Sequence, residues 1–77
     1  MNIEEFARNL ETEFEEMEPG TLNPETHFKK IKGWSSMHAL IIIAFVDANF
    51  NVILNGADIR SSETLSDLYS IIIEKSK

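Results

Sequence analysis

The stretch from Ser36 to Phe50 reads Ser-Met-His-Ala-Leu-Ile-Ile-Ile-Ala-Phe-Val-Asp-Ala-Asn-Phe. Its only charged residue is Asp47. The triplet Ile41-Ile42-Ile43 alone suits a β-strand, but the apolar run is longer than a typical strand. Length therefore predicts a helix over residues 36–50. The continuous apolar part, 37–46, is too short to span a bilayer and indicates a buried or half-buried helix.

Another helix is predicted at the amino end of the chain, from Ile3 to Met17. Its apolar positions recur every three or four residues, which gives one stripe of an amphipathic helix. We expect Asn2 and Glu5 to cap its start and the Pro19-Gly20 pair to end it. The opposite face is rich in glutamate and should be solvated. The apolar stripe is Ile3, Phe6, Leu10, Phe14 and Met17.

A long loop is predicted from Thr21 to Lys32, because this stretch contains Pro24 and has no clear period. Loops of this length are often functional or packed by their own side chains. Three apolar residues should anchor the loop, and its basic cluster should be solvated. The anchors are Leu22, Phe28 and Ile31, and the basic cluster is Lys29, Lys30 and Lys32.

After Phe50, the stretch 51–56 breaks the helical pattern and ends in the turn signal Asn55-Gly56. Ile53 and Leu54 are expected to be core anchors there, and a short helical turn is expected around 57–59. Thr64 followed by Asp67 predicts the capped start of a last helix. The apolar stripe of that helix is Leu65, Leu68, Tyr69, Ile72 and Ile73.

These elements predict an all-α fold, a small four-helix bundle with three main helices and one short one. The 77 residues form one domain, 1–77, and the absence of cysteine excludes disulfides and thiolate metal sites. Two separated histidines do not make a metal centre, so we expect no metal. The net charge of −6 disfavours nucleic acid and anionic membranes as partners. The start Met1–Glu5 lacks the features of a signal peptide, which predicts a cytoplasmic protein.

The junction before the central helix reads Gly33-Trp34-Ser35-Ser36-Met37. A serine at the start of a helix commonly caps it, because its oxygen accepts a hydrogen bond from a free amide. The same free amides and the positive end of the helix dipole favour a phosphate. Without further context, a simple cap is the stronger interpretation of Ser36. Trp34 is expected to pack in the loop.

The layout resembles the acyl and peptidyl carrier proteins over nearly the whole chain. The attachment signature of that family is Gly-x-Asp-Ser-Leu, which Gly33, Ser36 and, conservatively, Met37 match. Phe50 with Ile53 and Leu54 resembles the end of the family's second helix, and residues 64–68 resemble the capped start of its last helix.

The resemblance implies a bundle of acyl-carrier-protein type. It also implies that Ser36 is the attachment site of 4'-phosphopantetheine, which a phosphopantetheinyl transferase takes from coenzyme A. The thiol of that arm would carry acyl groups as thioesters in fatty-acid, polyketide or related biosynthesis. Acyl-loading and condensing enzymes would then be the partners of a monomeric carrier.

The chain departs from the family pattern in two respects. Ser35 replaces the acidic residue that normally precedes the modified serine. The central helix also lacks most of the exposed acids of the family, since Ile41 and Ala48 stand where acids are expected and only Asp47 remains.

These departures predict recognition of partner enzymes by apolar contact more than by charge. We expect four residues of the central helix to face the core: Leu40, Ile43, Val46 and Phe50. The partner-recognition residues are then expected on the other side: Met37, Ile41, Ala44, Asp47 and Ala48.

The chain is not expected to be an enzyme. Ser36 needs an adjacent base to act as a nucleophile, and His38 lies two residues away, a spacing that does not bring side chains together on a helix. His38 is expected to be exposed or half-exposed. The alternative function is an unmodified helical adaptor of the same fold, in which Ser36 is only a cap and the apolar face binds another protein.

Overall fold

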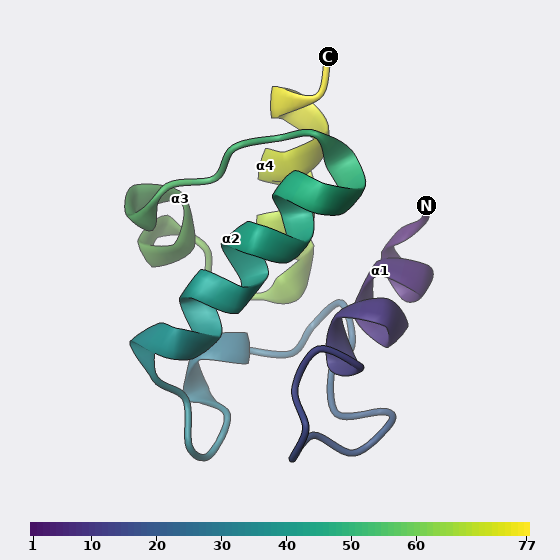
Figure 1. Cartoon of the computed structure of the whole chain (residues 1–77), viewed down its shortest axis with the longest axis vertical. Helices are drawn as coiled ribbons and strands as arrows, with labels where there is room; N and C mark the ends of the chain where they lie inside the picture. Colours follow the sequence, from purple (N-terminus) through teal and green to yellow (C-terminus); the bar gives the residue numbers. More distant parts are fainter.

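Helix α2 spans Ser36–Phe50, as predicted, and runs diagonally across the front of the computed structural model in Figure 1. The structure describes all 77 residues and contains no strand. The remaining elements are α1 (Ile3–Glu11), the 3-10 turn η1 (Phe28–Lys30), α3 (Gly56–Ser61) and α4 (Leu65–Lys75). The prediction of three main helices, one short helix and a long loop between the first two is confirmed. The chain is a small all-helical bundle.

Helix α1 is shorter than predicted, because it ends at Glu11 instead of reaching Met17. The Thr12 hydroxyl donates to the Asn9 carbonyl at 2.6 Å, a local bond that competes with continuation of the helix. The chain then continues as turns, in which the Phe14 amide donates to the Glu11 carbonyl at 3.1 Å. Phe14 is nevertheless buried, so the apolar stripe extends beyond the helix that it predicted.

The long loop is fixed to the helices on both sides. The Glu11 carboxylate accepts hydrogen bonds from the amides of Gly20 at 3.0 Å and Leu22 at 2.7 Å. Further along the loop, the amide of Leu65, at the start of α4, donates to the Thr26 carbonyl at 3.0 Å. The loop therefore folds back along the lower part of the bundle in Figure 1.

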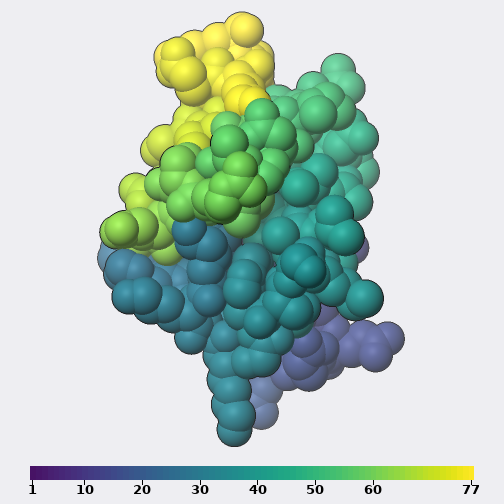
Figure 2. Space-filling view, turned by 90° about the vertical axis from the view of Figure 1, so that its left-hand side faces the viewer, coloured from purple at the N-terminus to yellow at the C-terminus, as the bar shows by residue number.

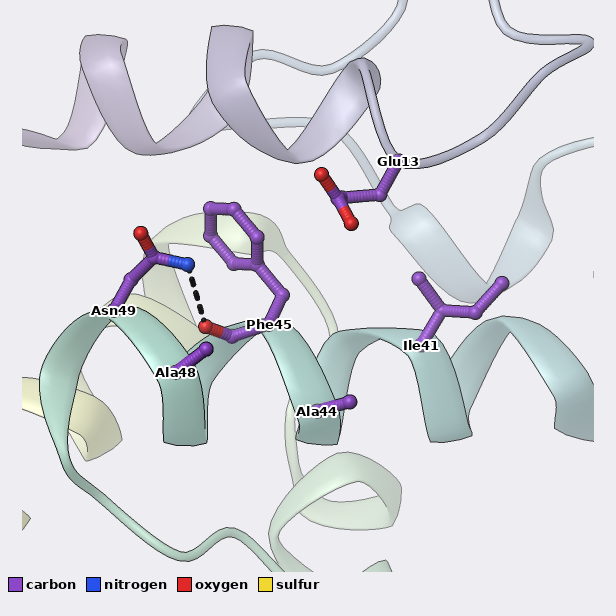
Figure 3. A pocket seen from close by; sticks show the side chains of 6 residues that line it. All are labelled: Glu13, Ile41, Ala44, Phe45, Ala48 and Asn49. Atoms are coloured by element: carbon purple, nitrogen blue, oxygen red, sulfur yellow. Dashed lines mark hydrogen bonds between the residues drawn. The ribbon is translucent and has the colours of Figure 1, made fainter.

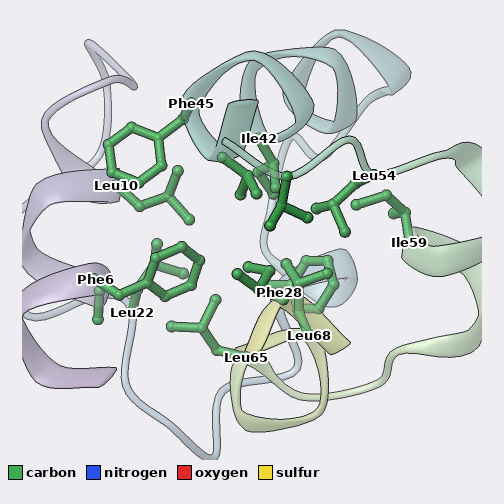
Figure 4. Packing of buried hydrophobic residues seen from close by; sticks show 14 of the residues in the cluster. Phe6, Leu10, Leu22, Phe28, Ile42, Phe45, Leu54, Ile59, Leu65 and Leu68 are labelled. Carbon is green, nitrogen blue, oxygen red and sulfur yellow. The ribbon is translucent and has the colours of Figure 1, made fainter. Parts of the chain in front are cut away.

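One core joins all the elements, as Figure 4 shows for side chains from α1, α2, α4 and the loop. Leu22 and Phe28, two of the predicted loop anchors, are buried. The third, Ile31, is partly buried and packs against the core. The buried apolar residues are Phe6, Ala7, Leu10, Phe14, Leu22, Phe28, Ile42, Phe45, Val46, Val52, Leu54, Ile59, Leu65, Leu68 and Ile72.

The core-facing side of α2 differs from the prediction. Val46 is buried as predicted, and Ile43 and Phe50 are half-buried against the core, but Leu40 is 65 % exposed. Ile42 and Phe45, which were not expected there, are buried instead. A helix that is apolar on all sides has no stripe from which its orientation can be predicted. The neighbouring elements therefore decide which face is buried.

The segment after α2 also corrects one prediction. Asn51 takes the left-handed conformation, with φ 56°, and ends the helix. The chain is then extended, and alternate side chains of an extended chain point in opposite directions. Val52 and Leu54 are accordingly buried, while Ile53, expected in the core, is 68 % exposed.

The aromatic ring of Phe6 connects α1 with α2 and α4. Its centroid lies 5.9 Å from that of Phe45, 5.7 Å from that of Phe50 and 5.4 Å from that of Tyr69. The Tyr69 hydroxyl donates to the Met1 carbonyl, which holds the start of the chain against α4. No helix of the structure combines the length and the apolar character needed to cross a bilayer.

Candidate functional site

The start of α2 is the candidate site, and Ser36 is the first residue of this helix. The capping position is occupied by Ser35, whose backbone is extended with φ −144° and ψ 172°. The expectation that Ser36 caps the helix is therefore wrong by one residue. Ser36 is exposed and its hydroxyl has no partner within the chain, so it is free to react or to be modified. Gly33, in the turn before the helix, has a φ of 84°, a left-handed conformation that favours glycine.

Ser35 belongs to a chain of three polar side chains that the sequence did not predict. Its Oγ lies 3.0 Å from Nδ1 of His38, and Nε2 of His38 lies 3.1 Å from Oε1 of Glu16. The amide of Ser35 also donates to Nδ1 of His38 at 3.2 Å. A hydroxyl, an imidazole and a carboxylate are thus hydrogen-bonded in series.

The neighbours of the His38 ring assign its neutral tautomer. The amide of Ser35 can only donate, so Nδ1 carries the lone pair and the proton lies on Nε2. That proton points to the Glu16 carboxylate, which can only accept when ionised. In this tautomer, the Ser35 hydroxyl can donate to Nδ1, and it shares the single lone pair there with the Ser35 amide.

His38 is held in place by aromatic rings on both sides. The ring of Phe14 stacks on it with a centroid distance of 5.1 Å and an interplanar angle of 23°, and Trp34 lies 5.3 Å away. Trp34 in turn packs edge-on against Phe28 at 5.5 Å, so its expected packing role is confirmed. Only 16 % of the His38 side chain is exposed, which makes it more enclosed than expected.

Glu16 is the exposed end of this series, with 71 % of its side chain accessible. A hydrogen bond from its own backbone amide and then the bond from His38 lower the pKa of the Glu16 carboxyl from its ordinary value. Glu16 is therefore an anion at neutral pH and a suitable acceptor for the ring proton of His38.

The predicted partner-recognition residues differ in exposure. Met37 is 67 % exposed at the first turn of α2, and Ala44, Asp47 and Ala48 are exposed further along, but Ile41 is half-buried. Asp47 lies outside the hollows that the others line.

Two adjoining hollows lie along α2 where it faces the end of α1. The larger, of about 400 Å³, is lined by Glu13, Ile41, Ala44, Phe45, Ala48 and Asn49. Figure 3 shows Phe45 and Ile41 rising from α2 toward the chain that carries Glu13. The second, of about 270 Å³, is lined by Glu13, Phe14, Glu15, Glu16, Met37, His38 and Ile41. Because Glu13 and Ile41 belong to both, the two hollows form one groove that begins at His38.

The surroundings of Ser36 are compatible with an anionic group. The first turn of α2 contains no acidic residue, and the segment before it, which projects from the lower edge of the molecule in Figure 2, contains Lys32. Lys29 is instead half-buried, since its ammonium donates to the Arg60 carbonyl at 2.8 Å, so the basic cluster is not wholly solvated. No group of three or more His, Asp or Glu side chains converges as a metal site.

No model of a known protein family matches this chain, and no curated protein or solved structure matches it either. Its function therefore has to be argued from the residues at the start of α2. The spacing Ser35-x-x-His38 resembles a capping box, which was the available signal for that contact. The contact with Glu16 depends on the turns after α1, which no periodicity indicates.

Proposed function

We propose that this chain is an acyl carrier protein, in which Ser36 bears a 4'-phosphopantetheine arm and the arm carries acyl groups as thioesters. The observation that carries the proposal is the exposed, unpartnered hydroxyl of Ser36 at the first residue of a long helix, after a long anchored loop. The order of elements and the motif around Gly33 and Ser36 support it. The fold would then be a bundle of acyl-carrier-protein type.

The residues around Ser36 fit the group. The free amides of the first turn of α2 favour the phosphodiester, although the Glu16 carboxylate is bound to His38 of the same turn. The arm would supply the thiol on which acyl groups are held. This chain supplies the hydroxyl, the exposed position and a surface for the transferase, and no base contacts Ser36 because His38 is bound to Ser35.

The partners in this proposal are a phosphopantetheinyl transferase and the acyl-loading and condensing enzymes of fatty-acid, polyketide or related biosynthesis. They would meet a monomeric carrier in the cytoplasm. The exposed apolar residues Met37, Leu40 and Ala44 favour contacts with little charge.

Mass spectrometry tests the attachment. The purified chain is incubated with coenzyme A and a phosphopantetheinyl transferase of broad specificity, and the protein from its native host is examined in parallel. We expect one phosphopantetheine-sized increment, lost in Ser36→Ala and kept in Ser35→Ala. Unmodified protein in both experiments, with an established carrier modified in the same tube, would reject the proposal.

A second candidate function is an unmodified adaptor that binds another protein through α2. The groove along this helix favours it, because Ile41, Ala44 and Ala48 present apolar surface next to the exposed Met37. Persistent absence of modification together with a partner whose binding is weakened by Met37→Glu would support the adaptor. Ile53→Glu, at an exposed apolar residue outside α2, is the matched control.

A further inference from the structure

The series Ser35, His38 and Glu16 has the order hydroxyl, imidazole and carboxylate, joined by distances of 3.0 and 3.1 Å. In serine hydrolases this order makes the hydroxyl nucleophilic, because the imidazole accepts its proton and the carboxylate stabilises the resulting imidazolium. The ring is reversed here, with the hydroxyl on Nδ1 and the carboxylate on Nε2, but the direction of proton transfer is the same.

We propose that Ser35 is a nucleophile that accepts acyl groups from uncharged esters and thioesters with apolar chains. His38 is its base, and Glu16 is the positioning residue that orients the ring of His38. This activity does not rest on an arm at Ser36.

The contacts of His38 exceed what a helix cap requires. The capping box pairs the Ser35 side chain with the His38 backbone and the Ser35 amide with Nδ1 of His38. The bond to Glu16 and the stacking on Phe14 are additional to that box. They fix one ring orientation and one tautomer, the two conditions that a general base has to meet.

Ser35 is open to a substrate, since it is exposed. The residues that follow it, Ser36 and Met37, occupy the first turn of α2, where backbone amides have no acceptor within the helix. Amides placed directly after a nucleophile are suitable donors to the oxyanion that forms when the hydroxyl attacks a carbonyl. The positive end of the helix dipole favours the same charge.

The groove along α2 indicates the substrate class. It begins at His38 and Glu16, and it continues past Ile41 toward Ala44. Its floor is apolar, so the chain of an acyl group fits along it. The carboxylate of Glu13 lies at the border of both hollows, as Figure 3 shows for the larger one, and disfavours an acyl chain that ends in an anion.

Water is the only reactant that the reaction needs besides the ester or thioester. The Ser35 oxygen forms a bond to the carbonyl carbon, while its proton passes to Nδ1 of His38. The bond from that carbon to the leaving oxygen or sulfur breaks, and the leaving group takes the proton from His38. Water then attacks the acylated Ser35 in the same way, which releases a carboxylic acid and restores the hydroxyl.

Two probes test the proposal on the full chain. A fluorophosphonate reacts with an activated serine by forming an oxygen–phosphorus bond with loss of fluoride, and peptide mass mapping then identifies the modified residue. p-Nitrophenyl decanoate reports acyl transfer by release of p-nitrophenolate. We expect the phosphonate on Ser35, and we expect both reactions to be lost in Ser35→Ala and kept in Ser70→Ala, at an exposed serine of α4 that lines neither hollow.

The contribution of Glu16 is tested with a matched pair of exposed glutamates. Glu16→Gln should lower the rate of both reactions by about tenfold or more, because loss of an oriented base removes roughly 10²- to 10⁴-fold of acceleration. Glu18→Gln should leave the rate unchanged, because Glu18 is exposed and lines neither hollow. Since both residues lie on the exposed segment after α1, neither variant is expected to unfold the protein.

A bulky substitution inside the groove tests whether the groove binds the acyl chain. Ala44→Trp should slow the reaction with p-nitrophenyl decanoate and leave the reaction with p-nitrophenyl acetate unchanged. The proposal is overturned if wild-type protein reacts no faster than Ser35→Ala, if the phosphonate is found on Ser36, or if Glu16→Gln and Glu18→Gln react equally fast. In each of these cases, His38 is a capping residue only.

Discussion

The Oε2 atom of Glu11 lies 2.7 Å from the amide nitrogen of Leu22 and is buried with it. The Arg8 guanidinium, 3.3 Å from the other carboxylate oxygen, balances the buried charge and also donates to the Leu22 carbonyl. A buried carboxylate is tolerated when it is paired and hydrogen-bonded in this way. This contact fixes the end of α1 and the start of the long loop relative to each other.

Replacement of Glu11 should therefore destabilise the fold. Glu11→Ala leaves the buried amide of Leu22 without an acceptor, which costs about 1–3 kcal/mol, and also removes the acceptor of the more exposed Gly20 amide. We expect a loss of this order in the free energy of unfolding, measured with urea. Glu11→Gln, which keeps one acceptor oxygen, should lose less. An equal loss in both variants would contradict the role given to the oxygen.

Replacing Ser35 should lower the free energy of unfolding more than replacing Ser36, the first residue of α2. Ser35 occupies the capping position, and replacement of a capping serine by alanine costs about 0.5–2 kcal/mol. Ser36, exposed at the first helical position, should change the free energy of unfolding by less than about 0.5 kcal/mol. Thermal or urea unfolding of Ser35→Ala and Ser36→Ala checks this order. The reverse order would show that Ser36 is the cap after all.

Leucine positions on α4 and α2 give a matched test of the core. Leu68 is fully buried, whereas Leu40 is 65 % exposed. Leu68→Ala should cost about 2–5 kcal/mol through lost burial and a cavity, and Leu40→Ala should cost less than about 0.5 kcal/mol. A comparable loss in Leu40→Ala would indicate that α2 is rotated relative to the structure.

Acid should weaken the fold partly through Asp58. A hydrogen bond from Lys75, at 2.7 Å, and then the Asn55 amide hold the pKa of Asp58 below its ordinary value of 3.8. Because the folded protein favours the charged form, this carboxylate stabilises the fold above about pH 4 and loses that contribution as the pH falls through its lowered pKa. Asp58→Asn should accordingly be less stable than wild type at pH 7.

The difference between wild type and Asp58→Asn should shrink toward pH 2, as measured by the urea midpoint at each pH. Asp47→Asn is the control, since Asp47 is exposed and forms no ion pair. A difference that stays constant from pH 7 to pH 2 would show that the effect of Asp58 is not electrostatic.

Much of the fold could be predicted because several local signals agree. The bounds of α2 followed from the length of the apolar run, and the capping boxes Asn2–Glu5 and Thr64–Asp67 are present as the sequence indicated. In each case, the interaction lies within one turn of a helix. Such contacts depend little on the remainder of the chain.

The predictions that were wrong or missing concern features that depend on contacts between distant parts of the chain. The outward position of Leu40 was not predictable from a helix that is apolar all round, and the outward position of Ile53 depends on which side of an extended segment faces the core. The contact between Glu16 and His38 joins residues 22 positions apart in the sequence. It requires the early end of α1, where the local bond from the Thr12 hydroxyl to the Asn9 carbonyl competes with the helix, and which the period of the apolar residues does not indicate.

The ring of Phe6 touches rings from both α2 and α4, while α1 itself is only nine residues long. A helix this short is not stable alone in water, so α1 can persist only after its two neighbours have assembled. We therefore expect the stability of α1 to depend on the contacts that Phe6 makes with its neighbours. Its amides should exchange with deuterium faster than those of α4, at a rate that Phe6→Leu increases without a matching change in α4.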